Sequence, residues 1–391
     1  MALIHRTIIR TMGSSMSKNQ VVLVQGPPRC GLSTVLRLLA TGLPSGGTIL
    51  DARGREGRAM LAHPERASAV RPILLEHACA ADAEMLLARL SGRHGPSGTF
   101  LSKAIQRPRF VLAGGPFSQP AIELGPLSLF EVGRASIKKR WLRGGYPESF
   151  CTTADEEAFT WLEGYAADLA YGALGAWGLP REPALIAGLL QAIAANNGKA
   201  FNANAEARAL GVSRPTIVRY IDMLKRAGIV MSVPAIGEAG LAGIRHGARV
   251  VRSNALYIRD SGLLHTLLGI HSADELTQRP GAAARSWTGF VVGQALGLVP
   301  PGASLHRFAS ADGAELDLVV IRNGVPIMLA AARRHRPVSV ERSISYAAKA
   351  LAGDCQARFI VVPDEGERAL PGGFVAIGAG TFLDEFASVT A

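Results

Sequence analysis

The stretch QGPPRCGLST, Gln25–Thr34, carries the strongest indication of the fold in the first part of the chain. It follows an apolar run, VVLV (Val21–Val24), and precedes an apolar helical pattern, VLRLLA (Val35–Ala40). A strand, a glycine-rich turn and a helix in this order predict a phosphate-binding loop with the motif G-x-x-x-x-G-K-[ST]. The residues that fit this motif are Gly26, Gly31 and Ser33. Leu32 stands where the motif has its lysine, which leaves three alternatives: nucleotide hydrolysis, nucleotide binding alone, or neither.

Short apolar runs alternate with helical stretches through the first 133 residues. The predicted strands are Val21–Val24, Gly47–Ala52, Arg71–Glu76, Arg109–Gly115 and Ala121–Leu129. This alternation is typical of an α/β fold with a parallel sheet. A phosphate group is then expected at the carboxyl end of the first strand, against a helix N-terminus.

The composition indicates a globular protein with anionic partners. The chain has 391 residues, of which 48% are hydrophobic and 19% charged, and this length suits about two or three domains. The formal net charge of +11 favours a nucleotide, a nucleic acid or an acidic surface as the partner.

The spacing of the cysteines and the length of the apolar runs indicate where in the cell the protein is located. The four cysteines are Cys30, Cys79, Cys151 and Cys355. No two have C-x-x-C spacing, which argues against a zinc site and favours a reducing cytoplasm. A phosphate loop would expose Cys30 and lower its pKa. The longest apolar run, Pro183–Ala195, is too short to cross a bilayer, so it is predicted to be a buried core helix and no membrane partner is expected.

The middle of the chain, residues 134–270, is predicted to be mostly helical. It opens with a basic cluster that is interpreted as a solvated face: Lys138, Lys139, Arg140 and Arg143. Further on, ALGVS (Ala209–Ser213) predicts a tight turn between two helices, with Ser213 as the N-cap of a helix over Arg214–Ala227. A strand over Ile229–Val233 follows, and this order is that of a winged helix.

The second helix of this pair carries a positive charge. Its basic residues are Arg214, Arg219, Lys225 and Arg226, against the single acid Asp222. Such a helix fits a DNA major groove, with Arg214, Thr216 and Arg219 as the contacting residues. The alternative is that the winged helix serves only as a packing module.

The last part, residues 271–391, is again predicted to be α/β. RFASADGAELDLVVIRNG (Arg307–Gly324) predicts two strands around an Asp312-Gly313 turn. Further buried strands are predicted over Pro326–Ala332 and Ala357–Gly366.

Several segments in this order resemble a known family. They are GPPRCGLST, FVLAGG, GPLSLFEV (Gly125–Val132), WLRGGYPESF (Trp141–Phe150), LYIRDSGLLHTLLG (Leu256–Gly269) and DGAELDLVV (Asp312–Val320). The chain resembles bacterial AAA-type ATPases whose C-terminal domain is similar to PD-(D/E)XK nucleases. The resemblance implies a cytoplasmic ATPase that uses ATP and Mg²⁺. It also implies three domains: a P-loop domain over 1–133, a helical lid with a winged helix over 134–270, and a nuclease-like domain over 271–391.

The phosphate loop departs from the family pattern at one position. The residues implied in nucleotide binding are Gly26, Arg29, Cys30, Gly31, Leu32, Ser33 and Thr34, with Ser33 also at Mg²⁺. Loss of a charge-assisted hydrogen bond from the lysine removes about 1.5–3 kcal/mol, which weakens binding roughly ten- to hundredfold. The backbone N–H groups and the helix dipole do not depend on lysine. Arg29 either supplies a substitute charge or is solvated.

The other catalytic positions of an ATPase are also altered. The strand that should end in Asp-Glu ends in Leu75-Glu76. Glu76 is therefore the candidate base, although an ordinary carboxylate at a strand end is the alternative. Ala113-Gly114-Gly115 stands where the family has Thr-Gly-Ser.

The nuclease-like domain lacks most of its active site. A metal-dependent nuclease of this class needs an aspartate and then Glu-x-Lys on the next strand. Glu315 and Asp317 are the remaining carboxylates, whereas Leu329-Ala330-Ala331 stands at the Glu-x-Lys positions and Thr288 replaces an upstream glutamate. Nuclease activity is not expected.

The leading hypothesis is a degenerate AAA-like ATPase that binds nucleotide weakly, has lost efficient hydrolysis and acts as a binding or regulatory protein. The alternatives are an ATPase of low activity and a winged-helix regulator that binds DNA. An unidentified protein partner and a homo-oligomer are left open.

Overall fold

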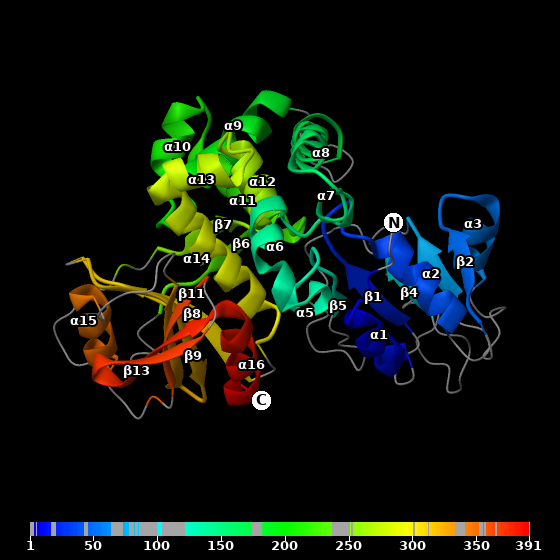
Figure 1. The fold of residues 1–391 in the computed structure, drawn as a ribbon. Coiled ribbons are helices and arrows are strands. Elements are labelled where there is room, and N and C mark those ends of the chain that lie inside the picture. The colour runs from blue at the N-terminus through cyan, green and yellow to red at the C-terminus, as the bar shows by residue number, and fades with distance from the viewer. Residues whose placement is uncertain are drawn as a thin grey trace.

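The computed structural model describes residues 4, 6–16, 21–42, 46–63, 73–77, 82, 85, 100–103, 122–173, 182–236, 251, 253–299, 302–311, 313–332, 341–351, 355, 357–363 and 366–390. Figure 1 shows the N-terminal sheet in blue on one side of the molecule and the C-terminal sheet in orange and red on the other. Helices of the middle part, in green and cyan, lie between and above them (Figure 1).

The N-terminal part is a five-stranded sheet in the order β2-β3-β4-β1-β5, with every neighbouring pair parallel. The strands are β1 Val21–Gln25, β2 Thr48–Asp51, β3 Ile73–Glu76, β4 Phe100–Lys103 and β5 Ile122–Glu123. The helices are α1 Ile8–Met16, α2 Leu32–Gly42 and α3 Arg55–Ala62. Apolar side chains of α1 and α2 pack on β1, so the glycine-rich loop between β1 and α2 is fixed at both ends.

Three of the five predicted N-terminal strands are confirmed as β1, β2 and β3. The predicted strand over Arg109–Gly115 lies outside the described residues, and β4 fills the place between β1 and β3. The prediction of a strand over Ala121–Leu129 was wrong for most of its length, because β5 has two residues and Leu129–Val132 forms α5. Ser128 and Glu131 make a capping box that starts this helix.

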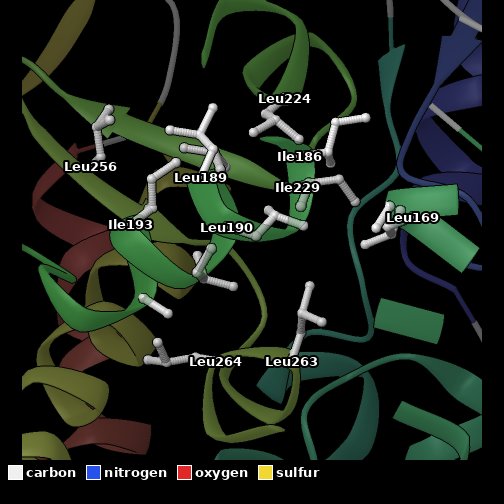
Figure 2. Close-up of a cluster of buried hydrophobic side chains, with 14 of the residues drawn as sticks. Leu169, Ile186, Leu189, Leu190, Ile193, Leu224, Ile229, Leu256, Leu263 and Leu264 are labelled. Atoms are coloured by element: carbon white, nitrogen blue, oxygen red, sulfur yellow. The ribbon is translucent and has the colours of Figure 1, made fainter. Parts of the chain in front are cut away.

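The middle part is mainly helical. Its elements are η2 Arg134–Ser136, α6 Ile137–Arg143, α7 Pro147–Phe150, α8 Asp155–Asp168, η3 Leu169–Ala173, α9 Pro183–Ala195, α10 Ala203–Ala209, α11 Arg214–Arg226, β6 Val230–Val233, β7 Ala255–Ile258, α12 Ser261–Leu267 and α13 Ala273–Gln278. The predicted buried helix over Pro183–Ala195 is confirmed as α9. Figure 2 shows Leu189, Leu190 and Ile193 of α9 within the buried cluster that joins these elements.

The predicted pair of helices followed by a strand is present as α10, α11 and β6. Ser213 caps α11, since its side chain accepts a hydrogen bond from the Thr216 backbone N–H at 3.3 Å. Gly228 ends the helix in a left-handed conformation, with φ of 68°. The strand β6 then pairs antiparallel with β7.

The C-terminal part is a six-stranded mixed sheet in the order β12-β13-β11-β10-β9-β8. Its elements are α14 Pro280–Leu296, β8 Ala303–Ala309, β9 Glu315–Arg322, β10 Val325–Ala332, α15 Arg342–Ala350, β11 Ala357–Val362, β12 Glu367–Leu370, η6 Pro371–Gly373, β13 Phe374–Gly378 and α16 Ala379–Thr390. Helices α14 and α16 pack on one face and α15 on the other. The predicted strands on either side of Gly313 are β8 and β9, while Asp312 lies outside the described residues.

Two sequence segments interlock at the centre of the molecule. A Cβ atom at Gly144 would overlap the carboxylate of Asp260, and one at Gly262 would overlap the carbonyl of Arg143. Asp260 accepts hydrogen bonds from the backbone N–H groups of Gly145 at 2.7 Å and Leu263 at 3.1 Å. The segments WLRGGYPESF and LYIRDSGLLH therefore meet at one close contact, which requires glycine at positions 144 and 262 and the carboxylate of Asp260.

The interpretation of the basic cluster as a solvated face was wrong for two of its members. Arg140 is 3% exposed and Arg143 is 9% exposed. Arg140 forms an ion pair with Asp260, with 3.6 Å between Nη1 and Oδ2, and Arg143 pairs with Asp155. Charge in the sequence did not reveal this burial, because the acid that pairs with Arg140 lies 120 positions further along the chain.

A buried polar network supports the same region. His265 lies with its Nδ1 2.9 Å from the Leu142 carbonyl oxygen and its Nε2 2.6 Å from Ser286 Oγ. Ser286 also accepts a hydrogen bond from Trp141 Nε1 at 2.9 Å. A carbonyl only accepts, so Nδ1 carries the proton and Ser286 donates to Nε2. Burial lowers the pKa of His265 to about 4, which keeps the ring neutral at pH 7.

Candidate functional site

The glycine-rich loop has the backbone conformation of an anion cradle. Arg29 and Gly31 have positive φ angles, of 63° and 95°, whereas the intervening Cys30 does not. Alternating backbone handedness turns successive N–H groups toward the same side and creates a concave, positively polarised surface. Helix α2 begins at Leu32, so the N–H groups of its first turn add to that surface.

The side chains of the two residues that flank Gly31 point into the protein. Leu32 is 4% exposed and Cys30 is fully buried, and both pack in the apolar cluster under the loop. The expectation that the loop exposes Cys30 was therefore wrong. Leu32 lacks the positive charge of the motif lysine, and its side chain also packs in the core that joins α2 to the sheet.

The other predicted loop residues lie at the surface of the loop. Arg29 and Thr34 are exposed, and Ser33 is half-buried at the first turn of α2. Gly26 leaves β1 where no side chain fits, because a Cβ atom there would overlap the carbonyl oxygen of Leu124. Leu124 N–H in turn donates to the Gln25 carbonyl at 2.7 Å, which ties β1 to the chain after β5.

The predicted second acidic position lies at the same edge of the sheet as the loop. Leu75 is fully buried, and Glu76 ends β3, two strands away from β1 in the sheet order. Oε1 of Glu76 is buried, and it has no hydrogen-bond partner in the part of the chain that the structure describes. A carboxylate oxygen without a hydrogen-bond partner is suited to accept a proton from water. The alternative is an ordinary carboxylate at the end of a strand, without a catalytic role.

Two residues beside Glu76 were missed by the sequence analysis. Asp51 ends β2 in register with Glu76, and its Oδ2 lies 3.2 Å from His77 Nδ1. Hydrogen bonds from the Arg53 side chain and backbone lower the pKa of Asp51 to about 2. His77 has a left-handed backbone, with φ of 55°. The signal was available in principle, because carboxyl ends of adjacent parallel strands meet at one edge.

The loop also touches the middle part of the chain. A Cβ atom at Gly228, which follows α11, would lie 3.0 Å from Pro27 Cδ. Arg259, which follows β7, forms an ion pair with Glu123 at the end of β5. Pro27 of the phosphate loop thus lies beside Gly228 at the end of α11, and the end of β5 is paired with the segment that follows β7.

The carboxylates predicted to be a nuclease remnant, Glu315 and Asp317, both lie on β9. Asp317 is half-buried on β9, and its Oδ2 accepts a hydrogen bond from the Ala332 N–H at 2.8 Å. Glu315 is exposed, and Leu329, Ala330 and Ala331 are fully buried in apolar clusters. Within the described ranges, no group of three His, Cys, Asp or Glu side chains could hold a metal ion.

The predicted DNA-contacting residues are not part of the buried face of α11. Arg214 and Arg219 are exposed and Thr216 is half-buried. Arg219 lies over the ring of Tyr220, with 5.6 Å between the guanidinium carbon and the ring centroid. The buried face of the helix packs in the core through Ile217, Tyr220, Ile221 and Leu224.

Comparison with known proteins places the chain in a family. The uncharacterized protein Rv2008c of Mycobacterium tuberculosis is 30% identical over 366 residues, which cover 91% of this chain and 79% of the relative. This chain belongs to the Rv2008c family. The uncharacterized protein Mb2031c of Mycobacterium bovis matches to the same extent. A family model described as a domain of unknown function, DUF8612, matches residues 134–274.

Two solved structures are similar over part of the chain. The Walker-type ATPase PABY2304 of Pyrococcus abyssi has a TM-score of 0.42 and 13% identity, covering 68% of this chain and 96% of that one. The RuvB Holliday junction branch migration motor of Thermotoga maritima has a TM-score of 0.30 and 14% identity, covering 69% and 96%. At this level the likeness does not establish a function. The P-loop arrangement rests on the parallel sheet and on the loop between β1 and α2. Among the described helices, none is both long enough and apolar enough to cross a bilayer.

Proposed function

We propose that this member of the Rv2008c family is an AAA-like protein that binds a nucleotide through its phosphate loop and does not hydrolyse it efficiently. The observation that carries the proposal is the backbone of Arg29–Leu32, which keeps the geometry of a phosphate cradle while the lysine position belongs to the core. Backbone N–H groups and a helix N-terminus bind phosphate without a lysine.

Magnesium fits the proposed site less well than phosphate does. Ser33 offers one hydroxyl at the first turn of α2, but Leu75 is apolar where an aspartate would hold the ion through water. Glu76 remains as the candidate base. With one oxygen ligand instead of two, we expect ATP to bind with little help from Mg²⁺, and transition-state charge to be poorly stabilised.

The proposal includes the organisation of the rest of the chain. Residues 1–133 form the nucleotide-binding domain, 134–270 a helical lid with a winged helix, and 271–391 a nuclease-like domain that has lost its catalytic residues. The order helix, three antiparallel strands, helix and strand from α14 to β11 supports the last assignment. The catalytic positions of the fold are apolar. This agrees with a regulatory role in the cytoplasm, exerted through a protein partner or through self-association.

The substitution Leu32→Lys tests this proposal. A lysine side chain is long enough to run from the buried position of Leu32 to the surface of the loop, where a charge-assisted hydrogen bond to the β- and γ-phosphates should tighten ATP binding about ten- to hundredfold. Hydrolysis should stay absent, because Leu75 still lacks a carboxylate. Binding is measured by calorimetry and phosphate release is measured on the same samples. Turnover in the wild type would contradict the proposal and favour the ATPase of low activity. Turnover in the variant alone would show that Leu32, and not Leu75, blocks hydrolysis.

A second candidate function is DNA binding by α11. The exposed side chains of Arg214 and Arg219 favour it. Duplex DNA affinity should then fall steeply with salt, and Arg219→Ala should reduce the slope of log affinity against log salt by about one. Arg342→Ala, which removes an exposed arginine of α15, is the control and should change neither. Salt-independent binding, or none, would leave α11 as a packing module.

A further inference from the structure

Tyr165 contacts the outside of the phosphate loop. Its hydroxyl oxygen lies 3.0 Å from the Pro28 carbonyl oxygen and 3.1 Å from the Tyr146 hydroxyl oxygen. A carbonyl only accepts, so Tyr165 donates to Pro28 and the Tyr146 hydroxyl donates to Tyr165. Burial raises the pKa of Tyr165 above its ordinary value, so the hydroxyl keeps the proton that it donates.

Arg6 contacts the peptide between Cys30 and Gly31 in the same loop. Its guanidinium donates from Nη1 to the Cys30 carbonyl at 2.7 Å and from Nη2 to the Gly125 carbonyl at 2.6 Å. Nε forms an ion pair with Glu131 at 2.9 Å. The residue is 4% exposed, so the guanidinium is a fixed part of the interior.

Each of these contacts also sets the direction of an N–H group. In a planar trans peptide the C=O and the N–H point in opposite directions, and the described residues contain no cis peptide. The Pro28 carbonyl points to Tyr165, so the N–H of Arg29 points away from Tyr165. The Cys30 carbonyl points to Arg6, so the N–H of Gly31 points away from Arg6.

We propose that Arg6 and Tyr165 are positioning residues of the phosphate loop, which aim the N–H groups of Arg29 and Gly31 at a bound diphosphate group. The inference rests on the proposed function and names what pre-organises its site in the absence of the lysine. Arg29 and Gly31 are the two residues with positive φ in the loop, and the two donors act on the peptides that enter them. A loop whose donors are fixed before binding loses little conformational entropy on binding.

The hydroxyl pair provides a matched test. Tyr165→Phe removes the bond to Pro28 and keeps the aromatic packing. Tyr146→Phe removes the neighbouring buried hydroxyl but keeps the bond from Tyr165 to Pro28. Each variant loses one hydroxyl from the same pair, so a purely structural role predicts similar changes in both.

The test measures the affinity of the full-length protein for inorganic pyrophosphate by calorimetry, together with the melting temperature. We expect Tyr165→Phe to weaken pyrophosphate binding about five- to tenfold, the effect of one hydrogen bond, and Tyr146→Phe to change it less than about twofold. Arg6→Lys, which keeps the charge but cannot reach both carbonyls, should also weaken binding. Equal affinities in the two Tyr→Phe variants, with binding intact in the wild type, would overturn this inference alone. No binding of pyrophosphate or ATP by the wild type would overturn both the inference and the proposed function.

Discussion

Asp260→Ala should lower the free energy of unfolding by about 3–5 kcal/mol, because it leaves a buried guanidinium without its counter-ion. The side chains of Arg140 and Asp260 are 4% and 0% exposed. The substitution also removes the N-cap of α12 and the acceptor for the Gly145 N–H. Helices α6 and α12 meet at this point, so the loss should destabilise the middle part of the molecule.

The measurement is a urea titration followed by tryptophan fluorescence, since Trp141 and Trp161 pack against the core of the middle part. Asp222→Ala is the matched control. Asp222 pairs with Lys225 on the outside of α11, where the two side chains are 43% and 38% exposed, and such a pair contributes less than about 1 kcal/mol. A similar, small loss in both variants would show that the buried pair does not hold the two segments together.

Gly26→Ala should remove nucleotide binding and lower the free energy of unfolding by about 1–3 kcal/mol. The added Cβ atom would overlap the Leu124 carbonyl oxygen and lie 2.9 Å from Cys30 Sγ. The chain around Leu124 cannot easily retreat, because its N–H is bonded to the Gln25 carbonyl. The loop must therefore move, and the N–H groups of Arg29 and Gly31 lose their common direction.

Calorimetry with ATP and thermal unfolding check this prediction. Gly13→Ala is the control, because Gly13 lies in α1 and a Cβ atom there meets nothing within 4 Å. Alanine in a helix interior is favoured over glycine by about 0.5–1 kcal/mol. The control should therefore bind ATP normally and unfold at a slightly higher temperature. Normal ATP affinity in Gly26→Ala would mean that the loop is not the binding site.

The parts of the fold that follow from neighbouring residues could be predicted from the sequence. The strand before the loop, the buried helix α9 and the Ser213 cap of α11 each depend on a pattern of fewer than about fifteen residues. The prediction for Ala121–Leu129 also rested on a local pattern, an apolar run that is typical of a strand. It was wrong because the Ser128–Glu131 capping box starts a helix within that run.

The parts that depend on distant residues could not be predicted. Arg140 and Asp260 are separated by 120 positions, so the sequence offered no reason to bury an arginine within a basic cluster. Tyr165 and Pro28 are 137 positions apart, and Arg6 reaches Glu131 across 125. At the site, the sequence placed the loop and Glu76 at one sheet edge, but not the donors that fix the loop from outside.

A calorimetric titration of the wild-type protein with ATP, with and without Mg²⁺, and an assay for phosphate release on the same sample show whether the loop binds nucleotide without hydrolysing it. We expect saturable ATP binding, little dependence on Mg²⁺, and no turnover. Absence of binding at millimolar ATP would contradict the proposed function, since the cradle between β1 and α2 would then be architecture alone. Turnover would contradict it as well, because Leu32 and Leu75 would then not have removed catalysis.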